Sequence, residues 1–372
     1  MKKFRAIGLM SGTSIDGIDL ALIESDGANY IKKIASDYLA YPLQLRNKIH
    51  DLIINKQTLK NIKLIENEIT EQHILLVNSF LSKNQISSKD IDVIGFHGHT
   101  ICHDPSDGFS WQIGNPQLLA YKSNIDVIFD FRNRDIIMKG QGAPLVPIYH
   151  FHLLKKFPEL SDKNIGVLNI GGISNLTIFK TNNEKSLMGY DVCFGNAPFD
   201  DLIKANFNWS FDLDGQLTSQ GSINFDIANK ILINPIFHQK IPRSFDRQDF
   251  IEALKPLNSI SIQDRLASFA YIITQSLKIS LAILSIKLDF IFVCGGGRKN
   301  LGIMNILQQQ LQETSIKNID QLNINGDDIE AEAFAFLAIR SILKLPISFK
   351  NTTGLKDADS ACGAVLYPKL NL

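Results

Sequence analysis

Glycine-rich turns carry the residue types in this sequence that could bind phosphate. The first runs from Gly8 to Asp19 between two apolar runs, an order that predicts a strand, a tight turn and a second strand. Gly12 and Gly17 lack a Cβ, so a ligand could approach the backbone closely there. Turn amides beside Ser and Thr hydroxyls can form an anion cradle. The same residues are equally compatible with an ordinary glycine hairpin.

Two later turns repeat this chemistry. Residues 164–179 again predict strand, glycine and hydroxyl turn, and strand, matching the pattern of residues 4–23 but not each residue. Gly295 to Gly297 follow a predicted strand at 289–293 and precede a helix. We therefore expect the two hairpins to hold the phosphates of a nucleoside triphosphate, with the third turn beside the nucleoside. Neither the P-loop pattern nor the dinucleotide pattern occurs.

Asp191 is the candidate base. Phosphoryl transfer needs a triphosphate clamp, a metal ion and a group that activates or positions the acceptor. Asp191 follows a predicted strand and lies in a polar turn between the two halves of the chain. A turn aspartate or a helix cap remains the alternative for this residue.

Strands and helices must position these turns. Apolar spacing predicts strands and helices in the same order in each half. In the first half we expect strands around the first turn and at 30–39, 91–96 and 125–129, and helices within 44–82 and at 115–121. In the second half we expect strands around the second turn and at 186–190 and 289–293, and helices at 222–232, 262–285 and 329–343. No linker rich in Pro, Gly or Ser separates the halves, so we expect them to pack around a cleft.

Composition limits the partners. The 372 residues are 45% hydrophobic and 20% charged, which is typical of a globular protein with a large core. The 38 basic and 38 acidic residues cancel, so no net field favours nucleic acid or a membrane surface. The N-terminus lacks the pattern of a signal peptide, and the apolar stretch 279–293 is too short and polar to span a bilayer. The four cysteines are far apart, which favours reduced thiols in the cytoplasm.

The glycine turns and several further segments occur in an order in which the sequence resembles the anhydro-N-acetylmuramic acid kinases of the sugar-kinase, actin and heat-shock chaperone ATPase superfamily. The resemblance covers essentially the whole chain. The segments that carry it are Gly8–Asp19, His97–Pro105, Gln112–Gly114, Asp130–Asp135, Gly140–Pro147, Asn169–Thr177, Val293–Asn300 and Asp327–Ala335.

The resemblance implies an α/β protein with a two-lobed ribonuclease H-like fold and an ATP cleft between duplicated lobes. Residues 1–145 would form the N-terminal lobe and 146–372 the C-terminal lobe, with the final helix packing back near the N-terminal lobe. It also implies a homodimer that uses ATP and Mg²⁺. Asp191 would activate water to attack the anomeric carbon of a 1,6-anhydro muramic sugar, and the freed O6 would take the γ-phosphate. The products would be N-acetylmuramic acid 6-phosphate and ADP.

The resemblance also assigns the binding residues. For ATP they are Gly12, Thr13, Ser14, Ile15, Asp16, Gly17, Ile18 and Asp19 in the first turn, Gly171, Gly172, Ser174 and Asn175 in the second, and Gly295, Gly296, Gly297 and Asn300 in the third. For the sugar they are His97, Thr100, Asp130, Arg132, Gln141 and Glu330.

Some of these residues have alternative interpretations. Arg132 and Asp135 could instead form a structural salt bridge. His97, His99 and His103 suggest a metal site, but we expect them to form hydrogen bonds and expect no protein metal site. Glu332 lies two positions from Glu330 on a predicted helix, so we expect it on the solvated face.

The sequence departs from the family pattern next to the candidate base. Val192, Cys193 and Phe194 stand where the family has small and hydroxyl residues, while Asp191 and Asn196 are retained. Lys139, His99 and Asn115 replace a glycine, a glutamine and an aspartate of the family. A catalytically weakened relative or an ATP-driven switch protein is the alternative function.

Overall fold

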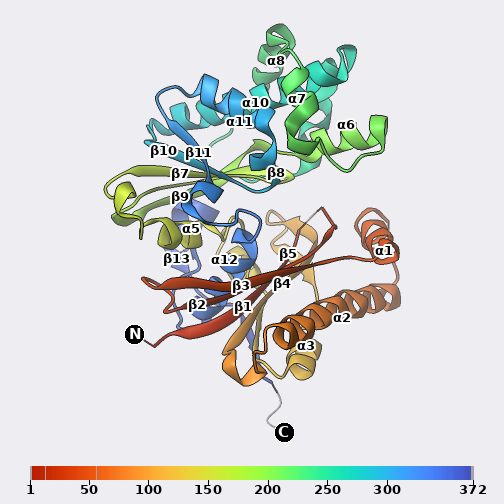
Figure 1. Ribbon diagram of the computed structural model, residues 1–372, viewed down its shortest axis with the longest axis vertical. Coiled ribbons are helices and arrows are strands. Elements are labelled where there is room, and N and C mark those ends of the chain that lie inside the picture. The colour runs from red at the N-terminus through yellow and green to blue at the C-terminus, as the bar shows by residue number, and fades with distance from the viewer. Residues whose placement is uncertain (1, 13, 56, 370–372) are drawn as a thin grey trace. The chain divides into compact units, whose positions relative to one another are not determined.

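The computed structural model describes residues 2–12, 14–55 and 57–369 (Figure 1). The chain forms two compact units, each built on one mixed sheet. The first unit comprises Met1–Lys156 and Asp328–Leu372, and the second comprises Phe157–Asp327. From sequence we divided the chain between residues 145 and 146, whereas residues 146–156 and 328–372 belong to the first unit.

The sheet of the first unit has the strand order β14-β6-β4-β1-β2-β3, and β5 pairs with β4. Its strands are β1 (Phe4–Ser11), β2 (Gly17–Ser25), β3 (Ile31–Ala40), β4 (Val93–Asp104), β5 (Phe109–Ile113), β6 (Val127–Phe129) and β14 (Val365–Tyr367). The first three form an antiparallel meander, and β4 and β6 continue the sheet in parallel from β1. The two short strands β12 (Ser348–Phe349) and β13 (Ser360–Ala361) pair separately.

The sheet of the second unit repeats this order as β9-β8-β7-β10-β11. Its strands are β7 (Asn164–Ile170), β8 (Ile173–Lys180), β9 (Asn183–Phe194), β10 (Phe290–Cys294) and β11 (Ser315–Asn318). Again the first three are antiparallel, and the next two extend the sheet in parallel from the first. The duplicated ribonuclease H-like topology expected from sequence is therefore confirmed within each unit.

Helices cover both faces of the first sheet. The helices of this unit are α1 (Leu43–Ile54), α2 (Leu59–Lys83), α3 (Pro116–Ser123), α4 (Asn133–Ile137), α5 (Pro147–Leu154), α12 (Ile329–Ile342) and α13 (Lys350–Thr353). Among them α1, α2 and α12 can be followed beside the sheet in Figure 1. Ile7 and Leu9 of β1 pack into a core with buried residues of α1 and α2. Gly8, between them, faces α12, where an added Cβ would lie 1.8 Å from the carbonyl oxygen of Ala331. Successive residues of β1 point to opposite faces of the sheet, so Ile7 and Leu9 pack into the core on one face while Gly8 leaves room for α12 close to the backbone on the other.

The second unit contains the long apolar helix α10. Its helices are α6 (Ala197–Phe207), α7 (Gln216–Gln220), α8 (Phe225–Leu232), α9 (Ile251–Leu254), α10 (Ile262–Leu284) and α11 (Leu301–Gln310). In the described part of the chain, α10 alone is long and apolar enough to cross a membrane, and 72% of its apolar window is buried. That burial is typical of a core helix. Short 3-10 helices lie at Ser88–Asp90, Pro158–Leu160, Leu213–Gly215, Pro235–His238, Arg247–Phe250, Lys255–Ser259, Gly296–Lys299 and Ile319–Leu322.

Candidate functional site

The first glycine turn joins β1 to β2, as predicted. Across it, Ile15 donates its backbone N–H to the carbonyl of Gly12 at 3.1 Å, and the Ser14 hydroxyl donates to Asp16 at 2.5 Å. Ile15 has a φ of 56°, an unusual value for a β-branched residue and a sign of local strain. Thr13, predicted to contact ATP, lies outside the described residues.

The two glycines of this turn differ in what their own surroundings require. A Cβ on Gly17 would lie 2.4 Å from the carbonyl of Leu39 on β3, so strand packing already demands a glycine there. Among the described residues other than its chain neighbours, a Cβ on Gly12 would have only the Ser14 hydroxyl within 4 Å, at 3.8 Å. The protein's own packing does not explain Gly12, which is what a site of close ligand approach predicts. Ile18 is fully buried, so only its backbone could take part in binding.

Tyr41 and His99 support the base of this turn. The Tyr41 N–H donates to the carbonyl of Asp16 at 3.0 Å, and its hydroxyl donates to Ser11 Oγ at 2.9 Å. Ser11 Oγ also lies 2.9 Å from Nδ1 of His99, which pairs with Ser11 across β1 and β4. Burial lowers the pKa of His99 to about 4, so this imidazole is neutral near pH 7. Tyr41 was not identified from sequence because it follows a strand end and matches no motif.

The second glycine turn joins β7 to β8. Gly195 and Asn196 donate backbone N–H groups to the carbonyls of Gly172 and Gly171, at 2.9 and 2.6 Å. A Cβ on Gly171 would meet nothing closer than 3.7 Å, so this position, like Gly12, has room. The buried Ser174 hydroxyl donates to the carbonyl of Phe194 at 3.1 Å. Ser174 thus links the turn to β9.

Asp191 lies in a polar row across the second sheet. Asn175 of β8 is the register partner both of Asn169 on β7 and of Asp191 on β9. Residues directly opposite one another in a sheet project from the same face. The row therefore brings the candidate base beside the predicted ligand-binding residue Asn175. It also includes Asn169, which was not among the predicted site residues although it precedes the second glycine turn.

The third glycine turn lies at the same edge of this sheet. The strands β10 and β7 pair in parallel, and Cys294 at the end of β10 is the register partner of Asn169. Gly295 has a φ of 71°, and a Cβ there would lie 2.3 Å from Asn169 Oδ1. Asn300 caps α11 by accepting the Ile303 N–H at 3.0 Å, so its side chain has a structural role. The carboxyl ends of neighbouring parallel strands are the usual location of ligand sites in α/β sheets.

Asp191 is held by a loop that we did not identify from sequence. Its backbone N–H donates to the carbonyl of Arg243 at 3.0 Å, and its carboxylate Oδ2 accepts the Phe245 N–H at 2.9 Å. Arg243 is 3% exposed, and its Nε donates to the carbonyl of Asp191 at 3.0 Å. The sequence gives little indication of this contact, because Arg243 is far from Asp191 along the chain and lies in no segment with periodic apolar residues.

The residues that depart from the family pattern point into the core. Val192, Cys193 and Phe194 are all buried, and the Phe194 ring contacts the rings of Phe250 and Phe269 at centroid distances of 5.5 and 5.8 Å. Burial raises the pKa of the Cys193 thiol to about 12, so it remains protonated. These substitutions therefore alter packing behind Asp191.

The predicted sugar-side residues all belong to the first unit. His97 is buried, and its Nε2 accepts hydrogen bonds from Arg132 Nε and Nη2, at 3.2 and 3.0 Å. Its Nδ1 lies 2.9 Å from the carbonyl of Gly98, which assigns the Nδ1–H tautomer. Burial and the neighbouring Arg132 cation keep the pKa of His97 well below its usual value. Its ring packs against Phe334 of α12 at 4.6 Å.

The other sugar-side candidates lie on β4 and on the loops after β6. Asp130 has a φ of 61° and accepts the Asn133 amide at 2.7 Å, and Thr100 accepts the Gln112 amide at 3.2 Å. Gln141 Oε1 is buried without a hydrogen-bond partner among the described residues. Glu330 is half-buried in the first turn of α12.

The structure shows which contacts the acidic residues with alternative interpretations make. Asp135 accepts the Gly142 N–H at 2.7 Å and the hydroxyls of Ser348 and Thr353 at 2.5 and 2.6 Å, so it organises a loop. Among the residues that the structure describes, no group of three or more His, Cys, Asp or Glu side chains could hold a metal ion. The prediction for Glu332 was wrong, because it is 2% exposed and accepts the Tyr149 hydroxyl.

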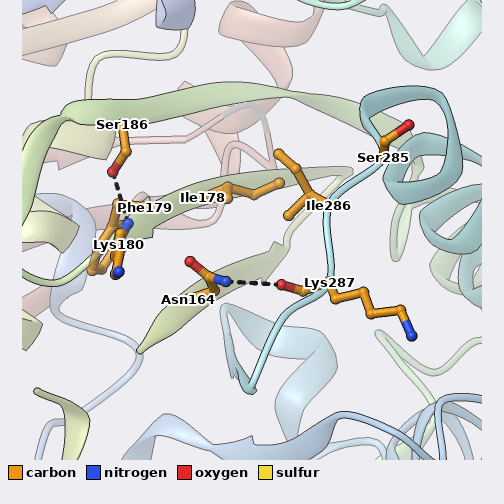
Figure 2. Close-up of a pocket in the computed structure, with 8 residues that line it drawn as sticks. All are labelled: Asn164, Ile178, Phe179, Lys180, Ser186, Ser285, Ile286 and Lys287. Carbon is orange, nitrogen blue, oxygen red and sulfur yellow. Dashed lines mark hydrogen bonds between the residues drawn. The ribbon is translucent and has the colours of Figure 1, made fainter. Parts of the chain in front are cut away.

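A shallow pocket of about 230 Å³ lies elsewhere in the second unit (Figure 2). It is lined by residues such as Asn164, Lys180 and Lys287, and Asn164 donates its side-chain amide to the carbonyl of Lys287 at 3.3 Å. Asn164 begins β7, whereas the glycine turn follows the other end of that strand. The pocket therefore lies apart from the polar row and includes none of the predicted site residues.

Comparisons with known proteins identify the family of this chain. The family model for anhydro-N-acetylmuramic acid kinase matches residues 4–368. An anhydro-N-acetylmuramic acid kinase of Zymomonas mobilis is 37% identical over 361 residues, covering 94% of this chain and 96% of that protein. One from Rhizobium etli is 34% identical, covering 97% and 98%. The chain belongs to the anhydro-N-acetylmuramic acid kinase family.

Proposed function

We propose that this protein opens the 1,6-anhydro bridge of 1,6-anhydro-N-acetylmuramic acid and phosphorylates O6, with ATP as the phosphoryl donor. The observation that carries this proposal is the family match over residues 4–368. The duplicated sheets, each with a glycine turn between its first two strands, support it. The products are N-acetylmuramic acid 6-phosphate and ADP.

Asp191 acts as the general base. It takes a proton from a water molecule whose oxygen forms a bond to the anomeric carbon, while the bond from that carbon to O6 breaks. O6 forms a bond to the γ-phosphorus, and the bond from this phosphorus to the ADP oxygen breaks. Support comes from the half-buried position of Asp191 and from the Phe245 N–H, which orients its carboxylate.

The glycine turns bind the nucleotide. Turn amides near Gly12 and Gly171 contact phosphate oxygens, since both positions leave space for close approach. Asp16 and Asp19 lie in the first turn and at the start of β2, so their carboxylates are the groups that would hold Mg²⁺. Mg²⁺ bound there would supply positive charge that offsets the charge on the phosphoryl group being transferred.

The sugar contacts come from the first unit. We assign them to His97, Thr100, Asp130, Arg132, Gln141 and Glu330. The buried Gln141 Oε1 is an acceptor that a sugar hydroxyl can satisfy. Arg132 is suited to the carboxylate of the lactyl group, because guanidinium and carboxylate form strong charge-assisted hydrogen bonds.

The test measures ADP release and phosphosugar formation together. We expect ADP release to require 1,6-anhydro-N-acetylmuramic acid and to equal the amount of N-acetylmuramic acid 6-phosphate found by mass spectrometry. N-acetylmuramic acid, which lacks the bridge, is the matched control and should give little turnover. ADP release that is independent of the anhydro sugar, with no phosphosugar, would instead favour an ATP-driven switch.

We also propose a cytoplasmic location and a homodimer. Four free cysteines support the first, because thiols persist in reducing compartments. Family membership is the support for the second. Sedimentation velocity at micromolar concentration tests it, and a single monomer boundary would contradict it.

A further inference from the structure

Arg243 is a buried cation whose donors all have neutral partners. The guanidinium is 3% exposed, so water contributes little to its hydrogen bonding. Nε donates to the carbonyl of Asp191, Nη1 to the carbonyls of Phe237 and Gln239, and Nη2 to the carbonyl of Val192 and the Ser280 hydroxyl, at distances of 2.9–3.1 Å. Such complete satisfaction allows a guanidinium to be buried. None of these acceptors cancels its charge.

The segment from Arg243 to Phe245 surrounds Asp191. The backbone N–H and carbonyl of Asp191 are bound by the Arg243 carbonyl and by its Nε, both at 3.0 Å. The Phe245 N–H binds the carboxylate at 2.9 Å, and the guanidinium carbon lies 5.2 Å from the centre of the Phe245 ring. The same side chain therefore anchors the backbone of the base and the loop that orients its carboxylate.

The neighbours of the guanidinium on β9 are neutral. Tyr190 and Cys193 on β9 also face it. Burial raises the pKa of both side chains, that of Cys193 to about 12, so both are neutral near pH 7. The hydrogen bonds to the main-chain carbonyls of Asp191 and Val192 are therefore the contacts by which the Arg243 side chain fixes this part of β9.

We propose that Arg243 is a positioning residue for Asp191, which it holds in place at the end of β9. This inference rests on the proposed function, in which Asp191 is the base. A misplacement of a catalytic group by about 1 Å can lower a rate by about a hundredfold. Arg243 would therefore control kcat without touching sugar or nucleotide.

Three variants separate positioning from stability. Arg243→Met removes the charge and the donors, Arg243→Lys keeps a cation but cannot reproduce the planar set of donors, and Ser280→Ala removes one acceptor remote from Asp191. For each variant, kcat and both KM values are measured between pH 4 and 8, and Tm is measured at each pH. Ser280→Ala is the matched control, because it perturbs the same guanidinium but leaves both contacts to β9.

We expect Arg243→Met to lower kcat by at least about tenfold and to keep KM for ATP within about twofold. Arg243→Lys should also have a reduced kcat, because a cation alone does not restore the planar set of donors. Ser280→Ala should lower Tm while its kcat stays within about twofold of the original. If Arg243→Met does not fold, the Lys variant decides the question.

Other results would overturn the inference. An Arg243→Lys variant with the original kcat would show that the donor geometry does not position Asp191. An unchanged kcat in folded Arg243→Met, or an equal loss of kcat in Ser280→Ala, would show that the contacts of Arg243 to β9 do not position the base. If the unchanged protein shows no sugar-dependent ADP release, the proposed function fails and this inference falls with it.

Discussion

Replacement of Gly12 by valine should weaken ATP binding while leaving the fold intact. Apart from its chain neighbours, the nearest described atom to a Cβ at this position is the Ser14 hydroxyl oxygen at 3.8 Å, an ordinary contact distance. Gly12 also has no left-handed backbone angle that would make a side chain strained. We therefore expect the free energy of unfolding to change by no more than about 1 kcal/mol.

The effect on the nucleotide is much larger. A phosphate oxygen that accepts a hydrogen bond from a turn amide lies about 2.9 Å from the nitrogen, which leaves no room for a branched side chain at Gly12. Loss of one or two charge-assisted hydrogen bonds costs about 1.5–3 kcal/mol each. Because about 1.4 kcal/mol corresponds to a tenfold change, the Kd for ATP should rise between about 10-fold, for one bond, and about 10⁴-fold, for two.

Calorimetric titration with a non-hydrolysable ATP analogue, and separately with the anhydro sugar, measures both affinities, while thermal unfolding measures stability. Gly8→Ala, on the strand that precedes this turn, is the contrasting variant. Its Cβ would lie 1.8 Å from the Ala331 carbonyl, so it should lose about 1–3 kcal/mol of stability or more. Unchanged ATP affinity in Gly12→Val, or equal losses for ATP and sugar, would refute the reasoning.

Other predictions concern single side chains. Asp191→Asn should lower kcat by about 10² to 10⁴ with ATP binding kept, because asparagine still accepts the Phe245 N–H; turnover within a few-fold of the original would exclude the base role. His99 has its pKa lowered to about 4, so the folded state binds fewer protons than the unfolded state and stability falls as pH drops from about 6.5. The free energy of unfolding should fall less between pH 7 and pH 4.5 in His99→Gln than in the original protein, by up to about 3 kcal/mol, as measured by denaturant unfolding at both pH values. The same fall in both proteins would contradict this. Burial raises the pKa of Glu332, so this side chain contributes to stability below about pH 4.5, and that contribution is lost as the pH rises through the pKa of Glu332 in the folded state. Glu332→Gln should gain Tm relative to the original protein as pH rises from 4.5 to 8, and a constant difference in Tm would argue against this.

The sequence by itself determined the order of elements and the family. The two glycine hairpins were predictable because a glycine and hydroxyl turn between two β-rich apolar runs is a local signal, and the observed β1–β2 and β7–β8 hairpins begin and end close to the predicted positions. The long helices were equally readable from their apolar spacing, and α10 and α12 match the predicted ranges within one residue or two.

Only the tertiary structure decided which contacts the polar residues make within the fold. Glu332 was misplaced because helical periodicity assumes one solvated face, whereas α12 packs against β1, β2, β4 and α5 and is buried over nearly all its length. Asp135 bonds a loop and Asn300 caps a helix, and neither contact could be inferred from the sequence. Arg243 and Asp191 meet through a loop that returns to β9, and a contact between residues so distant along the chain leaves no periodic trace in the sequence.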